Sequence, residues 1–232
     1  MVKIAIILAG GQGTRLRSVV SDVPKPMAPI NNRPFLEYQM DYWINQGVEQ
    51  FVISVGYKKE VIIDYFGENY KTAKIHYVVE DTPLGTGGGF LLAIKDINES
   101  CLLLNGDTFF EVDLPHLEKF HNEHASDWTM SLFRTNESGR YMGLDVDDDD
   151  GKIVSLESGT DKVGRLANGG VYLCNPSFIK AIGQKFVGKV SLEDDLMPKF
   201  IEEKGRLFGE EFSGCFIDIG VPDDYYRASS IL

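Results

Sequence analysis

The sequence predicts one α/β domain built on a mostly parallel β-sheet with helices on both faces. Short apolar runs alternate with segments whose apolar residues recur at helical spacing, which is the pattern of consecutive βα units. The run at residues 101–104 is wholly apolar, as expected of a central strand covered on both faces. Further short runs in the second half predict added strands, mixed or antiparallel.

The first half of the chain supplies the alternating units. Apolar residues at positions 35, 36, 40, 43 and 44 have helical spacing, and Gly47 ends this predicted helix. A glycine-rich turn precedes another helix. We expect strands at residues 4–8, 51–55, 75–79 and 101–104, and helices at residues 35–46, 59–66 and 87–94.

The pattern changes after residue 107. Ser191 has the chemistry of an N-cap, with Asp194 completing a loose capping pattern, and Pro222 fits the first turn of a closing helix. We expect helices at residues 114–125, 177–182, 192–203 and 222–230, and strands at residues 129–134, 144–146, 152–156, 170–174, 207–208 and 215–217.

Composition narrows the class of protein. No run approaches the roughly 18 apolar residues of a membrane span, and the N-terminus lacks a signal-peptide pattern. Cys101, Cys174 and Cys215 are odd in number and have no metal-ligand spacing, which favours reduced thiols. These features predict a cytoplasmic protein.

The charge is distributed unevenly. The net charge of −12 argues against nucleic-acid and anionic-membrane partners. Residues 1–33 nevertheless hold five cations and one acid, a net of +4, so the remainder carries −16. A positive island in an acidic chain suits a small anionic ligand, although a group of solvated cations is the alternative.

A glycine-rich loop lies within this island, at residues 10–13. The apolar run before it delivers the chain to the carboxyl edge of a sheet, where open α/β folds bind ligands. Glycines let backbone N–H groups approach a polyphosphate, and Arg15 and Lys25 add positive charge. The P-loop pattern is absent, and the dinucleotide pattern fails at Leu16. This arrangement predicts a nucleoside triphosphate site.

The string Gly10-Gly11-Gln12-Gly13-Thr14-Arg15-Leu16, with Pro24-Lys25-Pro26 beyond it, resembles the sugar-1-phosphate nucleotidyltransferases. Later strings resemble the same family in the same order, at residues 84–88, 104–107, 157, 168–172 and 218–222. The resemblance covers nearly the whole chain. It implies a Rossmann-like, GT-A-like nucleotidyltransferase fold in one domain of residues 1–232, with residues 1–110 binding the nucleotide and residues 111–232 the sugar.

The resemblance implies roles for the nucleotide-binding residues. Arg15 would grip the β- and γ-phosphates, and Lys25 would reach the α-phosphate or the sugar phosphate. With Asp107, these are the implied catalytic residues. The other implied nucleotide contacts are Leu8, Ala9, Gly10, Gly11, Gly13 and Thr14 around the phosphates, and Gly85, Thr86 and Gly87 around the base and ribose.

Asp107 and Asp218 each follow an apolar strand. Two carboxylates at neighbouring strand ends can hold one Mg²⁺, which prefers oxygen ligands and keeps some positions for phosphates. Taken alone, Asp107 is better explained as a turn or N-cap residue. The resemblance favours the metal, and Mg²⁺ is therefore the expected cofactor.

The implied sugar-binding residues show one departure from the family. The family's Glu-Lys pair is Glu157-Ser158 here, so the lysine that binds the sugar phosphate is absent. Lys162 or Arg165 on the following segment could replace it. The remaining implied sugar contacts are Asn105, Gly143 and Asn168.

The implied reaction joins a nucleoside triphosphate to a sugar 1-phosphate and releases pyrophosphate. The resemblance favours GTP and D-glycero-α-D-manno-heptose 1-phosphate, for bacterial surface-glycan synthesis. Mannose 1-phosphate is the second choice, and a uridylyl or thymidylyl transfer the third. The sequence leaves the oligomeric state open, a homodimer included.

Two other classes of protein are alternatives to a transferase. A non-catalytic subunit that binds a sugar nucleotide would not need both Asp107 and Asp218. A nicotinamide-dependent oxidoreductase would need an acidic ribose-binding residue after the second strand, where Ser54, Val55 and Gly56 stand instead.

Overall fold

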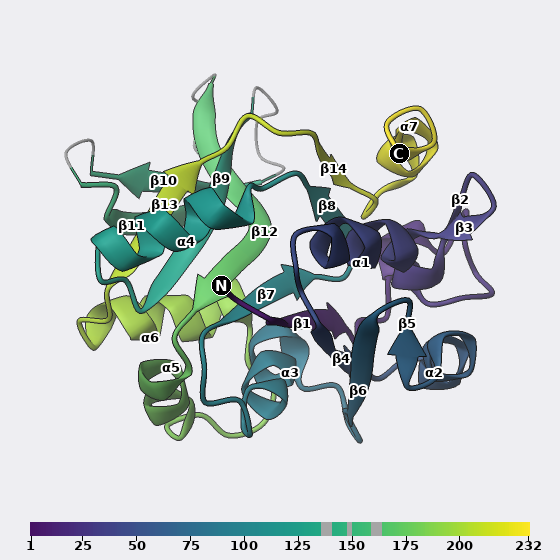
Figure 1. Cartoon of the computed structure of the whole chain (residues 1–232), viewed down its shortest axis with the longest axis horizontal. Coiled ribbons are helices and arrows are strands. Elements are labelled where there is room, and N and C mark those ends of the chain that lie inside the picture. The colour runs from purple at the N-terminus through teal and green to yellow at the C-terminus, as the bar shows by residue number, and fades with distance from the viewer. Residues whose placement is uncertain (136–140, 148–149, 159–163) are drawn as a thin grey trace.

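The central element is one mixed β-sheet. The computed structural model describes residues 1–135, 141–147, 150–158 and 164–232. Within these residues ten strands form the sheet, in the order β11-β10-β12-β7-β1-β4-β6-β5, with β9 beside β12 and β13 beside β9 (Figure 1). The predicted α/β class, with helices on both faces and added antiparallel strands, is confirmed.

The first half of the chain builds the parallel part of the sheet. β1 pairs in parallel with β4 and with β7, and β4 pairs in parallel with β6. These strands match the predicted apolar runs to within two residues. They are β1 (Ile4–Ala9), β4 (Gln50–Val55), β6 (Ala73–Val79) and β7 (Cys101–Asn105).

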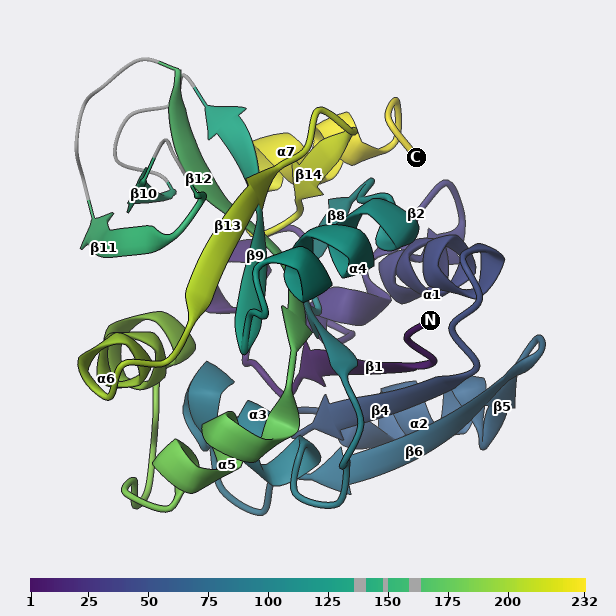
Figure 2. The ribbon, with the colours of Figure 1, turned by 60° about the vertical axis from the view of Figure 1, so that its left-hand side comes forward.

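The second half of the chain extends the same sheet. β12 runs antiparallel to β7 and to β9, and β13 returns parallel to β9. Figure 2 shows these long strands side by side. They are β9 (Trp128–Thr135), β10 (Met142–Val146), β11 (Ile153–Ser158), β12 (Arg165–Cys174) and β13 (Leu207–Glu211).

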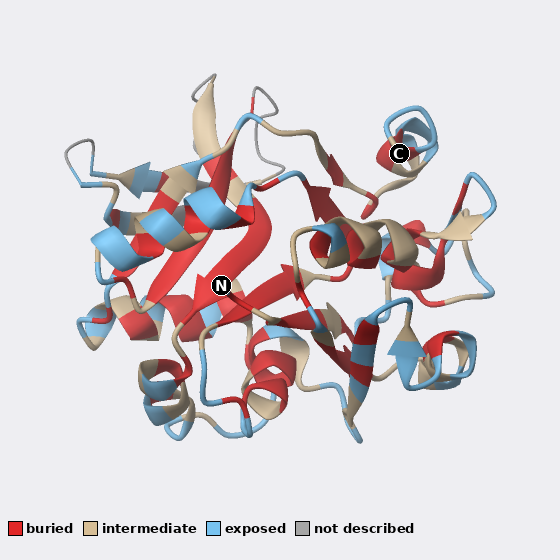
Figure 3. Cartoon of the chain, in the orientation of Figure 1, coloured by how far each residue is buried: buried red, intermediate tan, exposed pale blue. Residues whose placement is uncertain are grey.

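Helices cover both faces because side chains alternate along each strand. Ala5 and Ile7 of β1 face one core with α1, α2 and α4, whereas Ile4 and Ile6 face the other with α3, α5 and α6. Figure 3 shows the buried sheet between exposed outer helix faces. The helices are α1 (Phe35–Asn45), α2 (Lys59–Phe66), α3 (Gly85–Ala93), α4 (Leu114–Glu123), α5 (Pro176–Gly183), α6 (Met197–Glu202) and α7 (Pro222–Ala228).

Several short elements had no periodic signal in the sequence. They are two 3₁₀ turns, η1 (Thr14–Leu16) and η2 (Lys25–Met27), and the strands β2 (Pro29–Ile30), β3 (Arg33–Pro34), β5 (Asn69–Tyr70) and β8 (Thr108–Phe110). The strand predicted at residues 215–217 is present as β14 (Phe216–Asp218). β8 and β14 form a separate antiparallel pair beside the main sheet. The predicted strand at residues 215–217 therefore ends one residue later, at Asp218.

Two predicted helices differ at their starts. The helix expected from residue 192 begins with a π turn, η3 (Leu192–Leu196), and continues as α6. Its N-cap is confirmed, since the Ser191 hydroxyl accepts a hydrogen bond from the Asp194 N–H at 3.1 Å. Helix α3 starts at Gly85 rather than Gly87. None of the helices in the described residues is long and apolar enough to cross a membrane.

Candidate functional site

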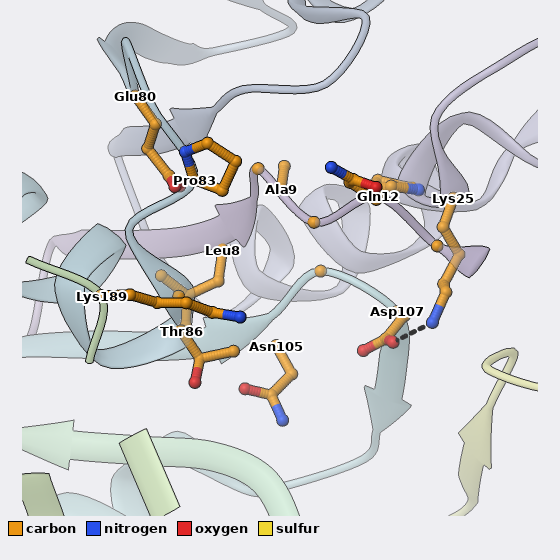
Figure 4. A pocket seen from close by; sticks show the side chains of 16 residues that line it. Leu8, Ala9, Gln12, Lys25, Glu80, Pro83, Thr86, Asn105, Asp107 and Lys189 are labelled. Atoms are coloured by element: carbon orange, nitrogen blue, oxygen red, sulfur yellow. Dashed lines mark hydrogen bonds and ion pairs between the residues drawn. The ribbon is translucent and has the colours of Figure 1, made fainter. Parts of the chain in front are cut away.

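A cavity of about 560 Å³ opens at the carboxyl ends of β1 and β7 (Figure 4). The two ends are held in register, with Leu8 opposite Asn105. The walls of the cavity come from five parts of the chain. The lining residues are Leu8, Ala9, Gly10, Gly11, Gln12, Gly13, Lys25, Pro26, Glu80, Pro83, Gly85, Thr86, Asn105, Gly106, Asp107 and Lys189.

The glycine loop presents bare backbone to this cavity. A Cβ on Gly10 would lie 2.2 Å from a carboxylate oxygen of Glu80, so this position accepts no side chain as it stands. Gly13 has φ +58°, a conformation that glycine adopts without strain, and it leads into η1. Gly11 and Gln12 are exposed, so an anion could approach the backbone of this loop.

Lys25 and Asp107 form an ion pair at the cavity wall. The Lys25 Nζ lies 2.6 Å from the Asp107 Oδ2, and the Lys25 side chain is only 11% exposed (Figure 4). Pro24 precedes Lys25 in an extended conformation, and Pro26 follows it inside the turn η2. The prolines restrict the backbone, so the ammonium group is aimed into the cavity by a stiff segment.

The backbones of Asp107 and Asp218, far apart in the chain, are brought together by the pairing of β8 with β14. Thr108 pairs with Asp218 in the β8–β14 ladder, and the Ile219 N–H donates to the Asp107 carbonyl oxygen at 2.9 Å. The Asp218 Oδ1 accepts a hydrogen bond from the Gly220 N–H at 2.6 Å. Asp218 does not line the cavity. Among the described side chains, no group of three or more His, Cys, Asp or Glu forms a metal cluster.

The structure gathers most of the sequence-predicted nucleotide residues and leaves three of them outside the cavity. Thr14 and Arg15 are exposed and do not line it, because η1 turns Leu16 into the core and faces its two preceding residues outward. Gly87 is buried, and its N–H donates to the Val190 carbonyl oxygen at 2.9 Å. A Cβ on Gly87 would lie 2.9 Å from the Ser191 carbonyl oxygen, which explains the glycine at this position.

Thr86 lines the cavity and also ties α3 to η3. Its hydroxyl oxygen accepts a hydrogen bond from the Leu192 N–H at 2.9 Å and lies 3.5 Å from a Glu193 carboxylate oxygen. Burial raises the pKa of Glu193 above its ordinary value. The Thr86 hydroxyl is therefore engaged within the protein.

The predicted sugar-binding residues lie along the sheet beyond the cavity. Gly143 stands opposite Glu157 on one side and Ala167 on the other, so these positions share one level of the sheet. Asn168 follows Ala167, and its amide donates to the Tyr172 hydroxyl at 2.7 Å.

Asn105 lies between the cavity and the predicted sugar-binding positions 143, 157 and 168. It lines the cavity, and a Cβ on Gly170 would meet its side chain at 3.0 Å. Gly170 has φ +70° at the irregularity in β12, which explains the glycine there. Lys162 and the side chain of Glu157 lie outside the described residues. Arg165 donates to the Tyr141 carbonyl oxygen at 2.6 Å.

Sequence reasoning missed six lining residues. Glu80 and Lys189 carry charge, and Lys189 reaches the cavity from a loop far along the chain (Figure 4). Glu80 lies four residues before Leu84 of the second glycine string, a spacing that could have drawn attention to it. No pattern marks Lys189. The others are Gln12, Pro26, Pro83 and Gly106.

The cavity is thus surrounded by a glycine-rich loop, an adjacent cation and a strand-end carboxylate, which is the arrangement that the sequence predicts for a nucleotide site. The comparison with known families agrees: the family model described as nucleotidyl transferase matches residues 4–232. The chain therefore belongs to the nucleotidyl transferase family, and the resemblance predicted from the sequence is confirmed.

Its relatives can be named more closely. The chain is 42% identical over 225 residues to the D-glycero-α-D-manno-heptose 1-phosphate guanylyltransferase of Campylobacter jejuni, covering 96% of this chain and 97% of that protein. It is 43% identical over 229 residues to the protein of the same name from Aneurinibacillus thermoaerophilus, covering 98% and 97%. The crystal structure of HddC from Yersinia pseudotuberculosis has a TM-score of 0.86, 34% identity and 99% coverage of both chains. That protein has also been solved complexed with GMP-PN, with a TM-score of 0.84.

The contact between Gly106 and β1 gives a test of how the site is held. A Cβ on Gly106 would lie 2.3 Å from the Leu8 carbonyl oxygen, which is backbone and cannot move aside alone. We expect Gly106→Ala to lower the free energy of unfolding by about 1–3 kcal/mol and to reduce turnover more than tenfold, because Asp107 is displaced. Urea denaturation and pyrophosphate release measure the two effects.

Gly11→Ala is the matched stability control, since a Cβ there would meet nothing within 4 Å. Its free energy of unfolding should stay within about 0.5 kcal/mol of the wild type. Equal free energies of unfolding for Gly106→Ala and Gly11→Ala would contradict the close contact between Gly106 and the Leu8 carbonyl oxygen.

Proposed function

We propose that this protein catalyses the transfer of GMP from GTP to D-glycero-α-D-manno-heptose 1-phosphate, forming the GDP-sugar and pyrophosphate. Two relatives with more than 40% identity over nearly their full length carry that activity in their names. The observation that carries the proposal is the cavity, which joins the glycine loop to the Lys25–Asp107 pair.

The proposed reaction needs positioning more than proton transfer. A phosphate oxygen of the sugar phosphate forms a bond to the α-phosphorus of GTP as the bond to the β-phosphate oxygen breaks, and pyrophosphate leaves with that electron pair. The nucleophile is already an anion, so no general base is required. The protein must hold mutually repelling anions in line and offset their charge.

The cavity residues can supply these functions. The amides of residues 10–13 would bind the β- and γ-phosphates. The Lys25 ammonium, already aimed into the cavity by its two prolines, would exchange part of its contact with Asp107 for a phosphate oxygen. We keep Arg15 as a partner of the leaving pyrophosphate, acting from the exposed turn that follows the loop.

The residues present fit one Mg²⁺. Asp218 stands opposite Thr108, the residue after Asp107, so the two carboxylates could offer hard oxygens to one ion, and substrate phosphates and water would supply the remaining oxygens. When bound, the ion would supply positive charge to the α-phosphate and the sugar phosphate.

The sugar would extend from Asn105 toward the row of Gly143, Glu157 and Asn168. The contact of Asn105 with Gly170 joins this row to the cavity without a gap in the sheet. We propose that residues 1–110 bind the nucleotide and residues 111–232 the sugar within one domain, with Lys189 reaching the nucleotide cavity from the second part.

Lys189 could take the role of the family lysine that is absent after Glu157, because it brings a second cation to the cavity. Figure 4 shows Lys189 and Lys25 entering the cavity from opposite sides of the view. Lys25 is paired with Asp107, so Lys189 is the better placed of the two to bind an added phosphate without losing a partner. Lys162 stays an alternative on its own segment.

We also propose the cytoplasm as the place of action, and a homodimer stays a prediction. The cytoplasm is supported by Cys101 and Cys174, which face each other across β7 and β12 as free thiols. Burial raises the pKa of Cys101 to about 12, which keeps it in the unreactive protonated form.

A substrate matrix tests the proposed function. We expect pyrophosphate release in Mg²⁺ with GTP and D-glycero-α-D-manno-heptose 1-phosphate to exceed that with ATP, CTP or UTP by at least tenfold in kcat/KM. Mannose 1-phosphate and glucose 1-phosphate complete the matrix. A clear preference for mannose 1-phosphate would shift the assignment to the second choice, and absence of pyrophosphate from every pair would refute a transferase.

Arg15 gives a second test. Arg15→Ala is expected to lower kcat by about 10²-fold and to change the KM for GTP much less, because the charge it would offset develops on the departing pyrophosphate. Arg17→Ala is the control, since the Arg17 guanidinium lies 4.9 Å from the Tyr57 ring centre and serves that contact. An Arg15→Ala protein with nearly full kcat would remove this residue from the mechanism.

Lys189 gives a third test. Lys189→Ala is expected to raise the KM for one of the two phosphate substrates about tenfold, the loss of one charge-assisted contact. Lys185→Ala controls for the loss of a positive charge on the same loop. The Lys185 Nζ lies 2.7 Å from the Glu203 Oε1, and Lys185 does not line the cavity. Similar steady-state constants for both variants would exclude Lys189 as a substrate contact.

A further inference from the structure

Four aromatic side chains gather beside β14, the short strand that ends at Asp218. The Phe216 ring is stacked on the Phe133 ring, with 3.8 Å between the ring centres and an angle of 18° between the planes. Phe110 and Tyr141 each meet Phe216 edge-on, with 5.6 Å between ring centres. We call these four residues the aromatic cluster. Among the described strands β14 pairs only with β8, so the cluster is what joins it to β9 of the main sheet.

Phe216 faces the same side of β14 as Asp218. Side chains alternate along a strand, so residues two positions apart share a face, and Ile217 between them points the other way. Ile217 is fully buried in a separate apolar cluster with Leu16 and Phe35. The aromatic cluster therefore supports the face of β14 from which the Asp218 side chain projects.

Phe133 lies at the level of the sheet that carries the predicted sugar-binding positions. It stands opposite Ala167 of β12, and Ala167 stands opposite Gly143 of β10. Gly143 in turn stands opposite Glu157 of β11. Close-packed interiors transmit strain, so a displacement at Phe133 reaches this row of positions. The stacked ring pair thus connects the row to the strand of Asp218.

Phe110 makes a second contact with the sugar side of the site. It pairs with Phe216 in the β8–β14 ladder and lies three residues after Asp107. A Cβ on Gly169 would lie 2.5 Å from the Phe110 ring, so this ring rests against the backbone next to Asn168. The aromatic cluster therefore lies between the strand pair of the two carboxylates and the strand that carries Asn168.

We propose that the stack of Phe216 on Phe133 positions the Asp218 carboxylate relative to the sugar-binding row, which makes Phe216 a positioning residue for the metal ion and the sugar phosphate. The inference rests on the proposed function and adds a residue that acts through Asp218. An aromatic pair contributes roughly a two- to tenfold factor to an equilibrium beyond the area it buries. The loss of the ring should therefore weaken metal and sugar-phosphate binding by a factor of that size.

The test removes the ring and keeps an apolar side chain. We expect Phe216→Leu to raise the KM for D-glycero-α-D-manno-heptose 1-phosphate and the dissociation constant for Mn²⁺ by about three- to tenfold each. The KM for GTP should change by less than about twofold, because the glycine loop that would bind the triphosphate follows β1. Pyrophosphate release at saturating Mg²⁺ gives both KM values.

Mn²⁺ binding provides a readout that does not depend on turnover. Mn²⁺ takes the same carboxylate and water ligands as Mg²⁺, and the paramagnetic resonance signal of the free ion falls as the protein binds it. The titration contains no substrate, so it reports the carboxylates alone. Partial unfolding lowers kcat and the number of Mn²⁺ sites per chain, and it leaves the KM and the dissociation constant of the folded fraction unchanged.

Phe212→Leu is the matched control. Phe212 follows β13 and has ring contacts with Phe110 and His116, so the variant loses the same side-chain volume outside the stacked pair. Its KM values and its Mn²⁺ dissociation constant should stay within about twofold of the wild type. Phe216→Tyr restores the ring and should return both affected constants to within about twofold of the wild type.

The outcomes separate this proposal from the proposed function. An active wild type, with a Phe216→Leu protein whose two constants rise no more than those of Phe212→Leu, overturns the role of Phe216 alone. A wild type that releases no pyrophosphate from any substrate pair overturns the proposed function, and the Mn²⁺ constants of the variants then decide the role of Phe216. An active wild type that binds no Mn²⁺ overturns the metal site and the role of Phe216 together. A rise of both constants in Phe216→Leu only supports the proposal.

Discussion

The close approach of two parallel strand ends determines the rest of the site. β1 and β7 run side by side to Leu8 and Asn105, and beyond them the Gly106 N–H donates to the Leu8 carbonyl oxygen at 3.1 Å. This contact places the glycine loop and Asp107 on the same edge of the sheet. Ligands of open α/β folds bind at such edges because the loops there diverge and leave a crevice.

Charge is sorted within the crevice that results. Lys25 and Asp107 stand together where the phosphates and the metal would lie, and Glu80 stands apart, held by Ser54 and Leu84. A carboxylate repels phosphates, so this distribution of charge favours a triphosphate whose phosphates lie toward Lys25 and away from Glu80. The distribution of charge in the cavity thus favours one orientation of the ligand.

Much of the fold could be predicted from the sequence because the strands of the parallel core are continuous apolar runs. The helix at α1 likewise followed from its spacing of apolar residues. The short strand β8 could not be predicted, since three residues carry no period. Its pairing with β14 could not be predicted either, because it joins chain positions about one hundred residues apart. The π turn at Leu192 also depends on tertiary contacts, among them the Thr86 hydroxyl.

The site was predictable where its residues follow strands directly, as Asn105, Asp107 and the glycine loop do. The outward direction of Arg15 was not, because it depends on the left-handed conformation of Gly13 and on the burial of Leu16. Glu80 and Lys189 were missed for a different reason. Each reaches the cavity through packing between segments distant in sequence, which no local pattern encodes.

The most direct measurement is a crystal structure of the protein with Mg²⁺ and a non-hydrolysable GTP analogue. Our account predicts the phosphates against the amides of residues 10–13 and the Lys25 ammonium, and the ion on Asp107 and Asp218. Phosphates bound at the Glu80 end, or a nucleotide bound outside the cavity between β1 and β7, would contradict it.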